Sequence, residues 1–360
     1  MSREYLWHSE SDAPRPETLV EVDDRLSADE ALKRVRRHEH LLHVGDFHNA
    51  KQLLQAMTRR LPPPQKTNSL REAFREERRC RQREFETLSR VLVEIEAGGT
   101  VRMSRGPDVS ELCRQLWGTP VQALPRILPL KTLLGMLSAT QFRKTGLQVP
   151  GLQQPLVPHY GVYVPTRFDY LLLLNQLEDV RGTTVFDIGT GTGVLSLMLL
   201  QNGAQRVTAT DIEPRAVECA TENAARHGFS SRFQVLQRHT FPDGKADLIV
   251  CNPPWLPEAP KNRVDRAVFD ADNEMLLHFL EQLPSHLTAA GRGVLLISNL
   301  AELLELRPVG WLAEQFQRFG LSVSEHREQR AAHSKARDKA DPLHAARSRE
   351  VTSMYVLQVK

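Results

Sequence analysis

The chain has 360 residues, a hydrophobic content of 41% and a formal net charge of +3 at pH 7, which favour two folded domains over one. No apolar run reaches the roughly 18 to 20 residues that a membrane span needs, and the polar N-terminus has no signal-peptide core. The four cysteines form no CxxC pair, which argues against a zinc site and for a reducing compartment. We therefore expect a cytoplasmic protein with neither a membrane segment nor a metal site.

The N-terminal part of the chain has a helical pattern. Residues 1–28 lack periodicity and are interpreted as a loose lead-in. Residues 29–155 are predicted to form a mainly helical domain, because apolar residues recur every three or four positions. A long charged helix is expected to place four apolar residues on one stripe: Phe85, Leu88, Leu92 and Ile95. Two more helices are predicted at 108–117 and 130–145.

Basic residues are concentrated in this N-terminal part. Residues 31–90 contain 15 Lys and Arg against 7 Asp and Glu. The excess has two interpretations: a solvated helix surface, or a face that meets RNA or another polyanion. A second basic stretch, 327–349, is expected to be a long loop.

From residue 156 to 360 short apolar runs alternate with helical segments. The runs "TTVFDIG", "RVTATD", "SRFQVLQ", "ADLIVCN" and "GRGVLLIS" read as strands, and the tail adds "LSVSEHRE" and "VTSMYVLQVK". A helix is predicted between "RVTATD" and "SRFQVLQ", with Pro214 in its first turn and Gly228 beyond its end. Strands that alternate with helices predict a parallel, doubly wound α/β sheet.

A glycine-rich loop follows the first of these strands. "VFDIGTGTGVLSL" places Asp187 at the strand end and then Gly189, Gly191 and Gly193 before a helix. About 20 residues on, Asp211 ends the next strand, where an acid can accept the hydroxyls of a ribose. An acid two residues before the first glycine favours a ligand with a cationic group, such as the sulfonium and ammonium of S-adenosylmethionine.

A second motif, "IVCNPPW", closes the fourth strand with a rigid Asn-Pro-Pro-Trp tetrapeptide. With "VFDIGTGTG", the Asp211 segment "TDIEP" and "IVCNPPW" in this order, the region from about 160 to 360 resembles class I S-adenosylmethionine-dependent methyltransferases. The resemblance implies a Rossmann-like seven-stranded sheet and methyl transfer to an sp² nitrogen. It also implies the cofactor-binding residues Asp187, Gly189, Thr190, Gly191, Gly193, Asp211, Ile212, His239 and Asn252.

The resemblance assigns catalysis to Asn252, Pro253 and Trp255. The side-chain oxygen of Asn252 and the backbone carbonyl of Pro253 would each accept one N–H of the target nitrogen, and the prolines would hold both acceptors rigid. Trp255 would offer a face on which a planar amide or base can stack. Two departures are visible. Trp255 stands where the glutamine enzymes usually have Tyr, and His239 stands where many relatives place an acid near the cofactor's adenine.

The segment "HYGVYVPTRFDYLLLLNQ" (159–176) narrows the resemblance to HemK/PrmC-type glutamine methyltransferases, and the motif order also matches adenine-N6 methyltransferases. The substrate is therefore expected to be a planar NH₂ group in RNA or in a ribosome- or translation-associated protein. Adenine in RNA is the first hypothesis because of the basic stretches, and a glutamine amide is the second. A non-catalytic cofactor-binding RNA-interaction protein and a nicotinamide-dependent oxidoreductase are further hypotheses.

Overall fold

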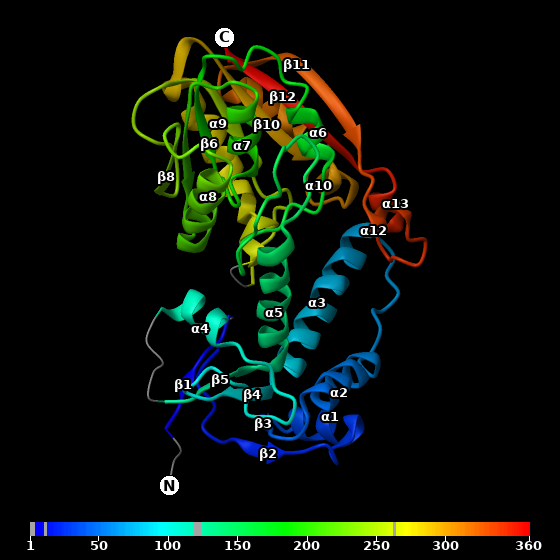
Figure 1. The fold of residues 1–360 in the computed structure, drawn as a ribbon. Helices are drawn as coiled ribbons and strands as arrows, with labels where there is room; N and C mark the ends of the chain where they lie inside the picture. The colour runs from blue at the N-terminus through cyan, green and yellow to red at the C-terminus, as the bar shows by residue number, and fades with distance from the viewer. Residues whose placement is uncertain (1–3, 11–12, 119–123, 262–263) are drawn as a thin grey trace. The chain divides into compact units, whose positions relative to one another are not determined.

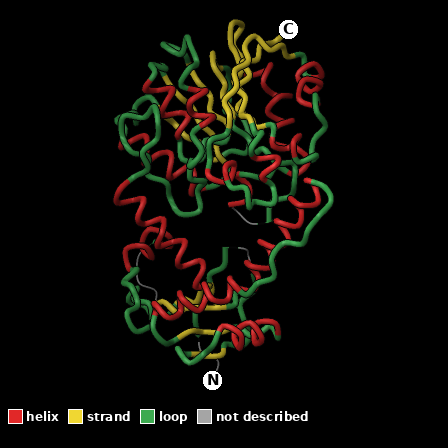
Figure 2. The backbone as a smooth tube through the Cα atoms, turned by 90° about the vertical axis from the view of Figure 1, so that its right-hand side faces the viewer, coloured by secondary structure: helices red, strands yellow, loops and turns green. Residues whose placement is uncertain are grey.

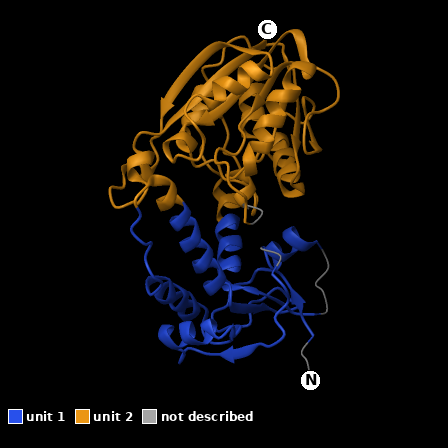
Figure 3. Ribbon diagram, turned by 180° about the vertical axis from the view of Figure 1, so that it is seen from behind, with its two compact units in different colours: residues 1–67, 75–140 blue, residues 68–74, 141–360 orange. Residues whose placement is uncertain are grey.

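The computed structural model describes residues 4–10, 13–118, 124–261 and 264–360, and its chain divides into two compact units. Unit 1 comprises Met1–Thr67 and Arg75–Thr140, and unit 2 comprises Asn68–Phe74 and Gln141–Lys360 (Figure 3). The expected boundary at residue 155 thus differs from the observed one. None of the helices in the described residues combines the length and apolarity that crossing a bilayer requires.

Unit 2 contains a seven-stranded sheet in the order β11-β12-β10-β9-β6-β7-β8 (Figure 1). The strands are β6 (Thr184–Ile188), β7 (Arg206–Asp211), β8 (Phe233–Gln237), β9 (Ala246–Cys251), β10 (Leu287–Ser298), β11 (Leu321–Arg330) and β12 (Val351–Val359). Strands β10, β9, β6, β7 and β8 pair in parallel, and β12 pairs antiparallel with both β10 and β11, so β12 alone runs against the other six. The predicted Rossmann-like seven-stranded sheet is confirmed.

Helices cover both faces of this sheet. They are α6 (Asp169–Leu174), α7 (Val194–Gln201), α8 (Pro214–Arg226), α9 (Glu274–His286), α10 (Leu300–Leu303), α11 (Trp311–Arg318), α12 (Ser334–Arg337) and α13 (His344–Arg347), with the 3₁₀ helices η1 (Val264–Ala267) and η2 (Ala271–Asn273). Because alternate strand residues face opposite ways, Val185 and Val250 pack with α6 and α7, whereas Phe186 and Cys251 pack with α9. The sheet is therefore doubly wound, as expected.

The basic stretch 327–349 is more ordered than the expected long loop. Strand β11 continues to Arg330, and the two short helices α12 and α13 follow before β12 begins at Val351. Leu343 and Ala346 are buried in an apolar cluster with Leu256, so this stretch packs beside the end of the Asn-Pro-Pro-Trp motif.

Unit 1 contains a five-stranded sheet in the order β1-β5-β4-β3-β2, in addition to the expected helices. Its strands are β1 (Leu6–Trp7), β2 (Val20–Val22), β3 (Leu41–His43), β4 (Val91–Ile95) and β5 (Arg126–Pro129). The helices are α1 (Ala28–Arg36), α2 (Phe47–Arg59), α3 (Leu70–Leu88), α4 (Ser110–Trp117) and α5 (Leu130–Thr145), of which α3 and α5 cross the division between the units. Figure 2 shows these helices in red and the short strands in yellow.

Two expectations for unit 1 are wrong. Leu92 and Ile95 belong to strand β4 rather than to the charged helix, which ends at Leu88. All five residues of β4 are buried, because the strand lies between β3 and β5. The lead-in 1–28 is not uniformly loose, since it supplies β1 and β2. Residues 1–3 and 11–12 of that lead-in lie outside the described residues.

Candidate active site

A cavity of about 320 Å³ lies in unit 2, where the loops after three neighbouring parallel strands meet. The loop after β6 contributes Gly189 and Gly191, the end of β7 contributes Asp211, and the segment after β9 contributes Asn252. Ligands of open α/β sheets bind beyond the carboxyl ends of the strands, so this is the position expected for a cofactor.

The glycine loop is fixed by hydrogen bonds to β7. The backbone N–H of Gly191 donates to Asp211 Oδ2 (2.8 Å), and Gly191 has a φ of 56°, in the left-handed region. Gly193 (φ 83°) lies against α8, where a Cβ at this residue would be 3.2 Å from the Cβ of Ala220. Glycine at 193 thus permits the close approach of α7 and α8.

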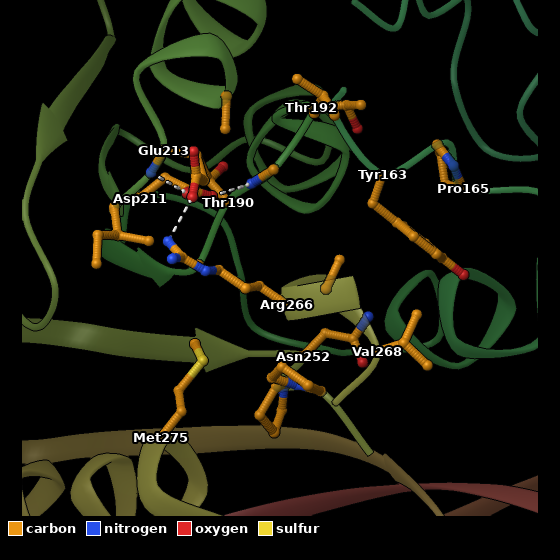
Figure 4. Close-up of a pocket in the computed structure, with 18 of the residues that line it drawn as sticks. Tyr163, Pro165, Thr190, Thr192, Asp211, Glu213, Asn252, Arg266, Val268 and Met275 are labelled. Carbon is orange, nitrogen blue, oxygen red and sulfur yellow. Dashed lines mark hydrogen bonds and ion pairs between the residues drawn. The ribbon is translucent and has the colours of Figure 1, made fainter. Parts of the chain in front are cut away.

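Asp211 and its neighbours form one wall of the pocket. Asp211 Oδ1 accepts from the backbone N–H of Glu213 (2.9 Å), and burial raises the pKa of Asp211. Ile212 is 45% exposed although it lies between these acids, so an apolar side chain faces the pocket beside a carboxylate. Glu213 Oε1 accepts from Arg266 Nη1 (2.8 Å), as Figure 4 shows.

Asp187 lies below the loop and not in the pocket wall. Its side chain is fully buried, and Oδ2 accepts hydrogen bonds from Thr190 Oγ1 (2.7 Å) and Ser196 Oγ (2.6 Å). The other oxygen, Oδ1, has no hydrogen-bond partner within the described part of the chain. Burial raises the pKa of Asp187 to about 6, although both hydroxyl donors favour the carboxylate.

The Asn-Pro-Pro-Trp motif is stabilised by its own side chains. The indole Nε1–H of Trp255 donates to Asn252 Oδ1 (2.9 Å). An indole N–H can only donate, so its partner on the Asn252 amide must be the oxygen and not the nitrogen. That oxygen keeps one lone pair for another donor. The buried Arg307 also donates from Nη2 to the backbone oxygen of Trp255 (3.3 Å) and to Asn273 Oδ1 (2.5 Å).

One face of the Trp255 ring is occupied. The guanidinium carbon of Arg167 lies 4.7 Å from the ring centroid, which is a cation–π contact. Tyr170 meets the same ring edge-on, with the ring centroids 6.4 Å apart. A planar substrate therefore cannot stack on the face that Arg167 covers.

The structure brings most of the predicted site residues to the pocket. The predicted residues that line it are Gly189, Thr190, Gly191, Asp211, Ile212, His239, Asn252, Pro253 and Trp255. Asp187 and Gly193 do not line it. Sequence reasoning did not name Tyr163, Arg167, Glu213, Arg266 and Met275, which also line the pocket. Figure 4 labels all of these except Arg167. Of the unnamed residues, Tyr163 and Arg167 fall in the segment 159–176 and Glu213 falls in "TDIEP", so these three had a sequence signal.

Among the described residues, one group has the spacing of metal ligands: His159, Glu218 and Glu222, whose ligand atoms lie within 4.8 Å of one another. Arg143 Nη2 donates to Glu222 Oε2 (2.8 Å), and His159 Nε2 lies 3.0 Å from the same oxygen. Glu222 is therefore already paired with an arginine, and this group does not support a metal centre.

Comparison with known proteins places the chain among methyltransferases. A family model described as ribosomal protein L11 methyltransferase (PrmA) matches residues 167–253. A putative protein N5-glutamine methyltransferase of Methanocaldococcus jannaschii is 33% identical over 178 residues, which cover 47% of this chain and 89% of the relative. The release factor glutamine methyltransferase of Deinococcus radiodurans is 33% identical over 223 residues, covering 58% of this chain and 76% of the relative.

A third relative acts on RNA according to its name. The tRNA1(Val) (adenine(37)-N6)-methyltransferase of Actinobacillus pleuropneumoniae is 32% identical over 157 residues, which cover 42% of this chain and 64% of the relative. The first two matches extend over most of each relative, and they agree with the fold and with the motif order. The chain therefore belongs to the class I S-adenosylmethionine-dependent methyltransferases, and it is an enzyme that transfers a methyl group to nitrogen.

Proposed function

We propose that the enzyme methylates the side-chain amide of a glutamine in a protein substrate. The observation that carries this proposal is the state of Trp255: its N–H is bonded to Asn252 and one of its faces is covered by Arg167. This arrangement leaves Asn252 able to accept from a slim amide, but it leaves a flipped base only one face of the Trp255 ring on which to stack. The two glutamine methyltransferase relatives support the same substrate class. The chain covers 89% and 76% of their lengths, against 64% of the adenine methyltransferase.

The proposed chemistry uses few groups of the chain. A bound S-adenosylmethionine supplies an electrophilic methyl on its sulfonium. The free lone pair of Asn252 Oδ1 and the backbone carbonyl of Pro253 accept the two N–H groups of the substrate amide. These contacts strengthen as the nitrogen becomes positive, so they stabilise the transition state more than the ground state. The nitrogen would bond to the methyl as the methyl–sulfur bond breaks and its electron pair stays on sulfur, and the nitrogen would then lose one proton to water.

The cofactor fits the pocket wall that Asp211, Ile212 and the glycine loop form. We infer that Asp211 accepts from the ribose hydroxyls and that exposed Ile212 and His239 lie near the adenine. The main chain at Gly191 stays accessible, because no atom of the described residues, apart from those of Gly191 and its two chain neighbours, lies within 4 Å of the position of a Cβ there. The buried carboxylate of Asp187 adds negative charge beneath the loop, which favours a cationic ligand.

Adenine in RNA is a second candidate substrate, because Tyr163 also lines the pocket and offers another aromatic ring. The adenine methyltransferase relative supports this candidate. The basic excess of residues 31–90 supports it less than the count alone indicates, since arginines there form ion pairs within the chain. Such pairs are Arg34–Glu39, Arg60–Asp29, Arg79–Glu76, Arg83–Glu76 and Arg81–Glu77.

Transfer of tritiated methyl groups into the lysate of a strain that lacks the gene distinguishes these candidates. Label that survives RNase, disappears with protease and is recovered as methylglutamine supports the glutamine proposal. Label that disappears with RNase and is recovered as methyladenine supports the second candidate. Cofactor binding without any transfer supports a non-catalytic protein. The Asn252→Ala variant is the matched control, because label that appears equally with this variant was not introduced by the enzyme.

Lowering the pH is expected to weaken cofactor binding through Asp187. Its pKa of about 6 means that the carboxylate is charged at pH 7 and mostly neutral at pH 5. A cationic cofactor prefers the charged form, so its Kd should rise by up to about tenfold between pH 7 and pH 5. Calorimetry at the two pH values measures this change.

Two controls isolate the charge of Asp187. The Asp187→Asn variant should bind the cofactor with nearly the same Kd at both pH values. S-adenosylhomocysteine, which lacks the sulfonium charge, should show a smaller pH dependence on the unchanged enzyme. Equal pH dependence of the enzyme and its Asp187→Asn variant would show that another group controls the affinity.

A further inference from the structure

Arg167 is held by two buried acids. Nη1 donates to Glu350 Oε1 (2.7 Å), while Nη2 and Nε donate to the two carboxylate oxygens of Asp169 (2.7 and 3.2 Å). Glu350 is 2% and Asp169 is 6% exposed. Two carboxylates face one guanidinium, so the site is not suited to bind a further anion such as the cofactor's carboxylate. Although Arg167 lines the pocket, its contacts assign it a different role.

Glu350 is itself fixed by other donors. Ser298 Oγ donates to Oε1 (2.6 Å), and His333 Nε2 lies 3.1 Å from Oε2. His333 Nδ1 accepts from the backbone N–H of Ala336 (3.2 Å), so Nε2 carries the proton that Glu350 accepts. Burial raises the pKa of Glu350, but these donors and the charge of Arg167 hold it at about 2. Glu350 is therefore ionised at neutral pH and holds Arg167 in one orientation.

The same guanidinium covers Trp255, whose N–H in turn bonds Asn252. We propose that Arg167 is a positioning residue for methyl transfer: it holds the Trp255 ring so that the indole N–H fixes the amide of Asn252. The inference rests on the proposed role of Asn252 and extends it to a residue 85 positions earlier in the chain. Trp255 then acts through its hydrogen bond and not as a stacking platform.

An NMR measurement tests the contact without any substrate. The four tryptophans give four indole N–H signals, and the one that disappears in Trp255→Phe belongs to Trp255. Arg167→Lys keeps the charge but cannot form the same paired bonds or cover the ring in the same way. We expect this substitution to shift the Trp255 indole signal and the side-chain amide signals of Asn252.

Arg232→Lys is the matched control, because Arg232 also covers an aromatic ring, Phe229 at 5.0 Å, but does not line the pocket. It should leave the Trp255 and Asn252 signals in place. If Arg167→Lys also leaves both signals in place, the proposal is wrong, whatever the substrate proves to be. Thermal unfolding of each variant confirms that the folded state is being compared.

Initial rates of methyl transfer into the lysate at saturating cofactor provide the second test. Arg167→Lys and Trp255→Phe should each lower the rate about tenfold, with unchanged cofactor Kd. If Arg167 acts through Trp255, the double variant is little slower than the slower single variant. A double variant about 100-fold slower than the unchanged enzyme would mean independent roles and would overturn the proposal. Label found in RNA instead of protein would refute only the substrate class.

Discussion

The Asn252→Ala variant is expected to turn over about 10²-fold more slowly than the unchanged enzyme, with a much smaller change in KM. The alanine has no side-chain oxygen to accept an N–H of the target nitrogen, and that acceptor matters most when the nitrogen becomes positive. Loss of one preorganised partner of a developing charge costs a factor of about 10² to 10³ in other enzymes. Steady-state kinetics on the substrate found by the labelling experiment measures both constants.

The structure adds a control for this prediction. Asn252→Asp keeps both the shape of the side chain and an oxygen that can accept from Trp255 Nε1. We expect Asn252→Asp to stay within about tenfold of the unchanged enzyme, because one acceptor position is retained. Near-normal turnover of Asn252→Ala would instead mean that the motif is only a turn that ends β9.

Unit 2 could be predicted from the sequence because its signals are local. The strand "RVTATD" was expected and observed at 206–211, and the helix that follows begins at Pro214, whose fixed φ suits a first helical position. The glycines and Asp211 meet at the pocket for a topological reason, since parallel strands place their carboxyl ends at one edge.

Unit 1 was harder to predict because its strands are short. The spacing of Phe85, Leu88, Leu92 and Ile95 fits a helix, but the continuous apolar run "VLV" within β4 is typical of a buried strand. The chain leaves the helix after Leu88, and the next residues form the sheet. The prediction was wrong because the helical spacing of apolar residues continues by chance past the end of the helix. Strands of two or three residues are too short to show any alternation.

The contacts around Arg167 could not be found from the sequence. Arg167 and its partner Glu350 are 183 residues apart in the sequence. The contacting residues Asp169 and Thr352 are separated by the same number. Local patterns describe helices and strands, whereas the pairing of Arg167 with Glu350 depends on how the start of α6 and the start of β12 come together in the fold. For the same reason the sequence did not show that a guanidinium covers one of the two faces of the Trp255 ring.

Replacing Asp211 by alanine is expected to raise the Kd for S-adenosylmethionine by about tenfold to 100-fold. A hydrogen bond to a charged group contributes about 1.5–3 kcal/mol, and the carboxylate is expected to accept from the ribose. The same carboxylate also accepts from the backbone N–H groups of Gly191 and Glu213, so the substitution loosens the glycine loop as well. Calorimetric Kd values therefore contain both effects.

A change in the ligand separates the two effects, because it leaves the loop intact. A cofactor analogue without the ribose 2′-hydroxyl should bind the unchanged enzyme more weakly than S-adenosylmethionine does. On the Asp211→Ala variant the two ligands should bind alike, since the acceptor is already absent. If the analogue loses the same affinity on both proteins, Asp211 does not contact that hydroxyl. The weaker binding of Asp211→Ala would then come from the 3′-hydroxyl or from the lost bonds to Gly191 and Glu213, which hold the loop against β7.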